Sequence, residues 1–145
     1  MNKLLQFVLL VLVSVSVNAQ IRFTHVNPAT DEIIVKNFGT TEVDIQQYRL
    51  CALFEYVTLS NASVTLVDGS FLLAPLSTVT ITWNAASGFN TLQSDLGLYL
   101  PMGSFGIAAN MVDFMQYGGA GQGRENVAVN AGLWTAGTFL TGTGP

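Results

Sequence analysis

The feature that most constrains this chain is a strict alternation of apolar and polar residues in short runs that end at turn-forming residues. Residues 79–83 (VTITW) show it most clearly, because every second side chain of an extended strand lies on one face. Residues 21–26 alternate in the same way, and residues 27–30 (NPAT) follow as a turn. No apolar spacing sustains a helical face over three turns. The pattern therefore predicts an all-β chain.

Further runs with strand character continue along the sequence. They span residues 32–36, 43–45, 48–53, 56–59, 63–67, 71–73, 95–100 and 110–117. The Asp68-Gly69 pair predicts a tight hairpin, whereas residues 84–94 carry no strong pattern and are expected to form a loop. About nine short strands in roughly 120 residues, with no repeat or linker, predict a single β-sandwich domain.

The first twenty residues differ from the rest. Lys3 precedes an apolar stretch over residues 4–13, and Val17-Asn18-Ala19 has the small residues of a cleavage site. These features predict a secretory signal peptide over residues 1–19 and a mature domain over residues 20–145. The apolar stretch is short for a membrane span, which takes about 20 residues, and no later stretch approaches that length. We therefore expect a secreted protein, extracellular or at the cell surface, with no membrane span in the mature chain.

Charge excludes several classes of partner. Without Lys3, only Arg22, Lys36, Arg49 and Arg124 oppose nine acidic residues. Four scattered cations do not neutralise a row of phosphates, so we expect no nucleic-acid partner, and no basic patch is present for anionic lipid. Cys51 is the single cysteine, so an internal disulfide is excluded, and we expect Cys51 to be a small buried apolar residue.

Residues 32–50 (EIIVKNFGTTEVDIQQYRL) carry a more specific pattern. A hydrophobic strand ends in Asn37-Phe38-Gly39, a Val-Asp-Ile step follows at residues 43–45, and Tyr48 and Leu50 come next. In this stretch the chain resembles the opening signature of lamin tail domains, and in particular the secreted bacterial members of that family.

The resemblance extends over roughly residues 21–117, most of the mature domain. It includes Leu73-Ala74-Pro75 before the strand at residues 79–83, and the strands at residues 95–99 and 111–118. Leu76 stands where the family usually has glycine, so this turn departs from the family pattern. The resemblance implies an immunoglobulin-like β-sandwich that serves as a binding or scaffolding unit. It brings no catalytic residues.

Three residues of the signature have a structural interpretation that does not depend on the family. The side chain of Asn37 can accept bonds from backbone N–H groups, and Gly39 can adopt the positive φ that a tight reversal requires. Asp44 can accept such bonds at the next bend. We therefore predict that Asn37, Gly39 and Asp44 form a structural turn.

The sequence offers few groups for catalysis or metal binding. His25 is the only histidine, and together with Cys51 it falls short of the three or four ligands that zinc usually needs. A nucleophilic pair of Cys51 and His25 is disfavoured, because both lie in predicted strands. Asp31-Glu32 and Glu42–Asp44 flank the same predicted turn and are expected to be solvated charges, because the calcium-loop pattern is absent. We predict no catalytic residue, no cofactor and no metal.

The segment over residues 118–126 (GGAGQGREN) is the most unusual in the chain. It lacks the Gly-Lys-Ser/Thr ending of a phosphate-binding loop and precedes no convincing helix. Its backbone freedom and polar side chains predict an adaptable binding loop at the end of the sandwich, with flanking aromatic residues to stack on a ligand. The candidate binding residues are Tyr117, Gln122, Arg124, Glu125, Asn126 and Trp134. In the alternative interpretation, Arg124 pairs with Glu125 or Asp113 and pins the loop, while Trp134 fills the core.

Three functions follow from these features. The first is a secreted, non-enzymatic interaction module that binds a protein or polysaccharide of the cell surface or extracellular matrix. The alternative is a structural subunit of an extracellular assembly that self-associates through exposed strand edges. A small secreted hydrolase is the third, and the scarcity of His, Cys and Lys disfavours it.

Overall fold

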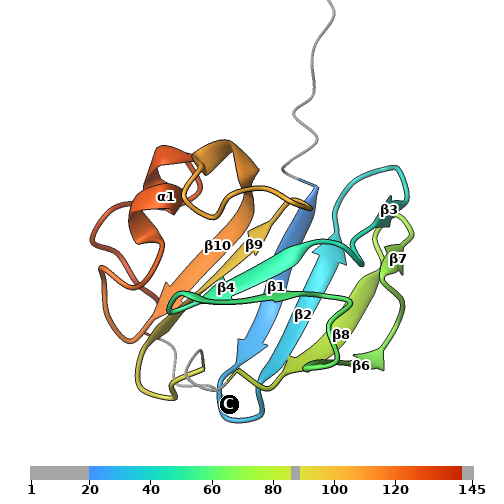
Figure 1. The fold of residues 1–145 in the computed structure, drawn as a ribbon, viewed down its shortest axis with the longest axis horizontal. Coiled ribbons are helices and arrows are strands. Elements are labelled where there is room, and N and C mark those ends of the chain that lie inside the picture. Colours follow the sequence, from blue (N-terminus) through green and yellow to red (C-terminus); the bar gives the residue numbers. More distant parts are fainter. Residues whose placement is uncertain (1–19, 86–88, 142–145) are drawn as a thin grey trace, which may run out of the picture.

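A computed structural model describes residues 20–85 and 89–141, so the predicted signal peptide at residues 1–19 lies outside the described part. The chain forms two four-stranded antiparallel sheets and one small two-stranded ladder (Figure 1). The first sheet has the order β1 (Ile21–Asn27), β2 (Glu32–Asn37), β8 (Thr78–Trp83), β6 (Val64–Asp68). The second has the order β10 (Met111–Tyr117), β9 (Ser94–Tyr99), β4 (Arg49–Ala52), β5 (Glu55–Thr58). The ladder joins β3 (Val43–Asp44) and β7 (Leu72–Leu73).

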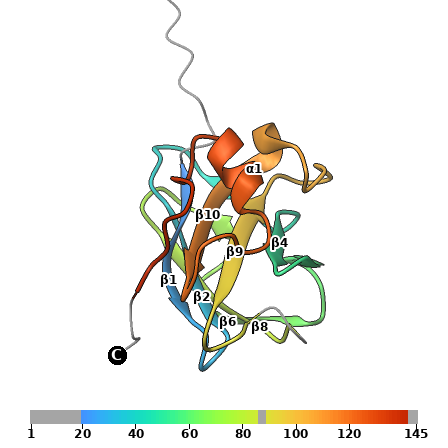
Figure 2. The same ribbon diagram turned by 90° about the vertical axis from the view of Figure 1, so that its left-hand side faces the viewer.

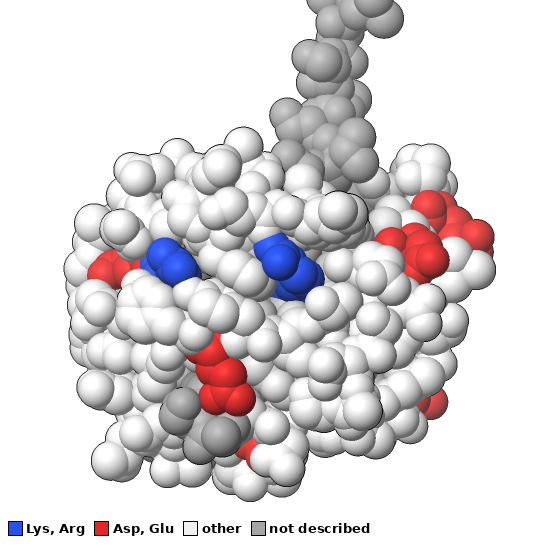
Figure 3. Space-filling view, viewed as in Figure 1, with Lys and Arg blue, Asp and Glu red and all other residues white. Residues whose placement is uncertain are grey.

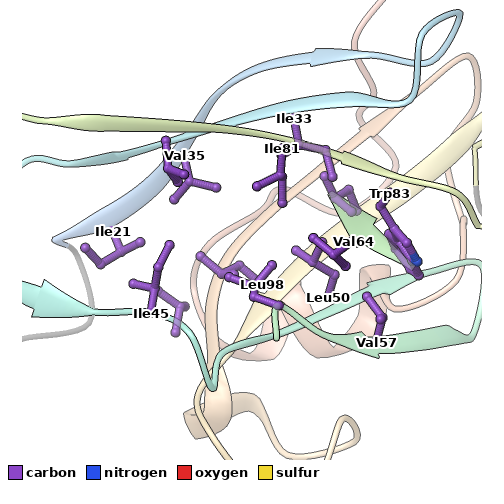
Figure 4. Close-up of a cluster of buried hydrophobic side chains, with 14 of the residues drawn as sticks. Ile21, Ile33, Val35, Ile45, Leu50, Val57, Val64, Ile81, Trp83 and Leu98 are labelled. Carbon is purple, nitrogen blue, oxygen red and sulfur yellow. The ribbon is translucent and has the colours of Figure 1, made fainter. Parts of the chain in front are cut away.

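The two sheets share one hydrophobic core. Figure 4 shows Ile33 and Ile81 of the first sheet facing Leu50 and Leu98 of the second, and all four side chains are fully buried. Removal of this apolar surface from water is the main stabilising contribution to such a fold. The prediction of an all-β chain is confirmed.

The first sheet follows the alternation in the sequence. In β8, Val79, Ile81 and Trp83 are buried, whereas the threonines between them are not. In β2, Ile33 and Val35 pair with Ile81 and Val79 and are buried in the same way. A strand with one buried face and one open face produces this period of two.

The second sheet is buried on both faces along its middle strand. Every residue of β9 is buried. One face meets the shared core, and the other lies beneath the helix α1 (Glu125–Asn130), the 3-10 turn η2 (Ala108–Asn110) and their loops (Figure 2). Val127 and Ala128 of α1 pack there against Cys51, Tyr99 and other side chains of the second sheet.

The two sheets approach each other along one side, where β1 lies next to β10. The carboxylate of Asp113 in β10 accepts a hydrogen bond from the backbone N–H of Phe23 in β1, at 2.7 Å. Both strands are irregular at this point, because the register shifts between Phe23 and His25 and between Met111 and Asp113. Bulges of this kind turn an edge away from open pairing.

Three expectations about local structure are wrong. Gly69 does form a turn at φ 85°, but β6 pairs with β8 and the next strand pairs with β3, so no hairpin forms at Asp68-Gly69. Asp31 and Glu32 lie at the start of β2, whereas Glu42–Asp44 follow its other end, so these carboxylates do not flank one turn. The glycine-rich loop does lead into a helix, α1, whose six residues are too few to show a helical period.

Candidate functional site

The hairpin between β4 and β5 has an unusual two-residue tip. Ala52 pairs with Glu55, so Leu53 and Phe54 alone make the turn, and both have positive φ, 45° and 67°. Turns of this type strongly favour Asn-Gly, because a side chain at positive φ costs about 1–2 kcal/mol. Phe54 is also 55% exposed, so burial does not offset that cost. Backbone strain at an exposed aromatic residue is typical of functional positions.

A buried carboxylate holds this tip in place. Asp95 lies on the outer face of β9 and is fully buried. Its Oδ1 accepts a hydrogen bond from the backbone N–H of Leu53 at 2.7 Å, and its Oδ2 accepts one from the backbone N–H of Arg124 at 2.9 Å. Burial raises the pKa of Asp95, and the two N–H donors partly oppose that rise. One side chain thus fixes the hairpin tip against the glycine-rich loop.

Gly123 makes this close approach feasible. Its φ is 37°, and a Cβ atom there would lie 2.3 Å from Oδ1 of Asp95. Only glycine combines that conformation with that distance.

The guanidinium of Arg124 lies over the hairpin. It donates a hydrogen bond to the hydroxyl of Tyr56, and its Cζ stands 5.0 Å from the ring centre of Phe54 and 5.7 Å from that of Tyr56. These distances are those of cation–π contacts. Tyr56 is 42% exposed, so both rings also present surface to solvent.

The arrangement continues along the sheet. The ring of Tyr56 stacks on that of Phe105 at 4.1 Å, and the guanidinium of Arg49 lies 4.1 Å from the centre of the Phe105 ring. Phe105 in turn meets the buried ring of Tyr99 edge to face at 4.8 Å. We call Phe54, Tyr56, Phe105, Arg49 and Arg124 the aromatic–arginine row. Figure 3 shows two basic groups and several acidic groups on one face of the molecule, with uncharged surface between them.

Arg49 and Arg124 form no ion pair with a carboxylate of the described residues. The ion pair between described side chains joins His25 and Glu32, at 3.9 Å, and involves neither arginine. An open hollow of about 290 Å³ lies at one end of the row, lined by Phe54 and residues 121–126. The row therefore offers positive charge, exposed rings and a small concavity on one surface.

The candidate residues of the binding loop separate into two groups. Gln122, Arg124, Glu125 and Asn126 all line the hollow. Tyr117 and Trp134 do not line it. Tyr117 is buried and donates its hydroxyl proton to the backbone oxygen of Asn90 at 2.7 Å. The indole N–H of Trp134 bonds to the oxygen of Thr138 at 3.0 Å, and its ring packs edge to face on Phe114.

The alternative pairing of Arg124 with a carboxylate is not seen. Glu125 accepts a hydrogen bond from the backbone N–H of Gly137 at 2.7 Å, and Asp113 bonds to β1 as described above. Sequence reasoning missed five members of the site: Arg49, Phe54, Tyr56, Asp95 and Phe105. Leu53-Phe54 carries no turn signal, and an isolated aspartate in an apolar run gives no hint of its partners.

The predicted turn residues lie together at the end of β2. The Asn37 amide donates to the backbone oxygens of Thr41 and Leu73, at 2.8 and 3.0 Å, and its oxygen accepts the N–H of Gly39 at 2.9 Å. Asp44 accepts the N–H of Gln46 at 2.9 Å. Gly39 does not use a positive φ; a Cβ atom there would instead overlap the side chain of Gln20.

The groups considered for catalysis lie far apart in the fold. Cys51 is buried in β4, where burial raises its pKa to about 12, and His25 lies on β1 beside Glu32. In the part of the chain that the structure describes, no three His, Cys, Asp or Glu residues gather in a metal-binding group. Within the same part, no helix is both long enough and apolar enough to cross a membrane.

Comparison with known proteins gives no family for this chain, so its function must be inferred from the site. The chain matches no protein-family model, no curated protein and no solved structure.

Proposed function

We propose that this chain is a secreted, non-enzymatic interaction module that binds a partner at the cell surface or in the extracellular matrix through the aromatic–arginine row. The observation that carries the proposal is Phe54, an exposed ring held at positive φ beside the Arg124 guanidinium, which forms no ion pair with any carboxylate of the described residues. We further propose that the fold is an immunoglobulin-like sandwich of the lamin-tail type. Its two antiparallel sheets and the Asn37 turn support that assignment.

The row has the rigidity that recognition needs. Asp95 anchors the backbone on both sides of it, and the stacked rings of Tyr56 and Phe105 hold each other in place. A surface that is ordered before binding loses less conformational entropy when a partner docks. Aromatic and arginine side chains are also the residues that contribute most to binding energy at interfaces.

The experiment is capture of purified protein by cell-envelope and extracellular-matrix fractions. Wild type is compared with the double variant Phe54→Ala/Arg124→Ala and with the control Phe38→Ala/Lys36→Ala. The control removes a second cation–π pair, in which the Lys36 ammonium lies 5.0 Å from the Phe38 ring centre at the end of β2, away from the row. We expect the first variant to lose capture and the control to keep it, with thermal unfolding checked for both. Equal capture by all three proteins would rule out the row as the binding surface.

Self-association is the second candidate function. The edge strand β6 carries Leu66 and Val67, and Leu72 of β7 lies nearby in the chain; each is roughly half exposed. Exposed apolar edge strands are a recognised route to strand pairing between molecules. Light scattering distinguishes the two functions. A monomer that binds envelope fractions supports the module, whereas an oligomer that Val67→Lys dissociates supports the assembly subunit.

A further inference from the structure

We infer that the aromatic–arginine row binds an acidic polysaccharide, specifically a chain of uronic-acid sugars whose carboxylates meet Arg124 and Arg49. This inference rests on the proposed function and names the class of ligand for the same site.

Charge complementarity is the first argument. The chain is acidic, yet two of its basic residues stand in one row, and neither forms an ion pair with a carboxylate of the described residues. The buried carboxylate of Asp95 interacts with the charge of Arg124 from behind the row, on the side away from solvent. The guanidinium of Arg124 gives one hydrogen bond to Tyr56, which leaves other terminal N–H donors for a ligand. A guanidinium matches the planar oxygens of a carboxylate with two parallel hydrogen bonds, so a carboxylate suits both Arg124 and Arg49.

The exposed rings are the second argument. Phe54 and Tyr56 present aromatic surface beside the Arg124 guanidinium. A pyranose ring offers a flat face of C–H groups that stacks on an aromatic ring, while its substituents remain free to hydrogen-bond. A uronic acid combines this face with a carboxylate on the same rigid ring. An acidic polypeptide has the carboxylates but no comparable rigid C–H face.

The extent of the row is the third argument. From Arg124 it passes over Tyr56 and Phe105 to Arg49, so two cations are separated by stacked rings. A polymer with one carboxylate on every sugar presents carboxylates at intervals along its length and can therefore meet both cations. The hollow of about 290 Å³ beside Phe54 has room for one sugar unit, and Gln122, Glu125 and Asn126 line it together with Arg124. Amide groups are suited to hydroxyl recognition.

The test measures binding of oligogalacturonate to the full protein by calorimetry. Fully methyl-esterified oligogalacturonate serves as the uncharged probe with the same rings, and poly-aspartate serves as the acidic polypeptide. We expect oligogalacturonate to bind and the esterified probe to bind at least about tenfold more weakly. Arg124→Ala and Phe54→Ala should each weaken binding by about tenfold, and Lys36→Ala should leave it unchanged despite the same loss of charge.

Each contrary result has one meaning. Equal binding of the esterified probe overturns recognition by charge, and equal or tighter binding of poly-aspartate overturns the choice of a sugar. Equal weakening by Lys36→Ala overturns the site and leaves only general electrostatics. No binding of oligogalacturonate, with envelope capture still dependent on Phe54 and Arg124, overturns the ligand class alone. Loss of both overturns the proposed function as well.

Discussion

The outer faces of the two sheets differ sharply. On the first sheet, the outward side chains of β8 are threonines that reach solvent, and the strand reads as a simple alternation. On the second sheet, the outward residues Asp95, Gly97 and Tyr99 of β9 are as buried as the core, because α1, η2 and their loops lie over them. The cover ends at the tip of β4–β5, where Arg124 lies over Phe54 and Tyr56, and the aromatic–arginine row lies at that margin. A partly covered sheet thus provides both a rigid support and an open surface.

The largest expected effect tests whether this outer cover is a true second core. Tyr99→Ala removes a fully buried ring that packs on Phe105, so we expect unfolding free energy to fall by about 3–5 kcal/mol. Thr80→Ala is the matched change on the outer face of β8 and should alter it by no more than about 0.5 kcal/mol. Urea unfolding at neutral pH measures both. Similar values for the two variants would show that the faces do not differ in energy.

The first sheet could be predicted from sequence because its pattern is local. Residues 79–83 alternate, and in the structure Val79, Ile81 and Trp83 face the core as expected. The role of Asn37 could also be predicted, because an asparagine side chain at the end of a strand often bonds to the backbone of the turn that follows. In these places the nearest neighbours along the chain decide the structure.

The second sheet and its site could not be predicted in this way. Asp95 contacts Leu53 and Arg124, which are 42 and 29 residues away, and no local pattern announces either bond. α1 forms because Val127 and Ala128 cover the sheet, although six residues have little helical stability alone. The glycines of residues 118–126 predict a loop, but the contact of this loop with the β4–β5 hairpin depends on tertiary packing.

The next largest expected effect on stability concerns Gly123, which we compare with Gly137, a glycine of positive φ that lies in open space. Gly137→Ala places a side chain at φ 76° in open space, so we expect a loss of about 1–2 kcal/mol from backbone strain alone. Gly123→Ala adds overlap with the Asp95 carboxylate, which should raise the loss by about 1–3 kcal/mol. Thermal unfolding of both variants measures the difference. Equal losses would mean that the contact between Gly123 and Asp95 is not tight.

Replacement of Asp95 by Asn should have a somewhat smaller effect. The amide keeps one acceptor oxygen, so one of the two backbone N–H groups loses its buried partner, at a cost of about 1–3 kcal/mol that removal of the buried charge partly offsets. Asp44→Asn is the matched control, because Asp44 is exposed and serves a single N–H at the end of β3. We expect the control to change unfolding free energy by less than about 0.5 kcal/mol. A neutral Asp95→Asn variant would show that the carboxylate does not hold the hairpin tip.

The smallest expected effect is a pH dependence of stability. It arises from two aspartates, Asp95 beneath the cover and Asp113 where β10 lies next to β1. Burial raises the pKa of each above its ordinary value of 3.8, so the native state binds more protons than the unfolded chain between that value and the raised pKa. Their contribution to stability is therefore fully present below pH 3.8 and is lost as pH rises through the raised pKa. We expect the urea midpoint of the wild type to increase from neutral pH to about pH 4, by less in Asp95→Asn and in Asp113→Asn. A wild-type midpoint that changes with pH in the same way as those of the two variants would contradict this, since it would mean that burial of the two carboxylates does not favour their protonated forms.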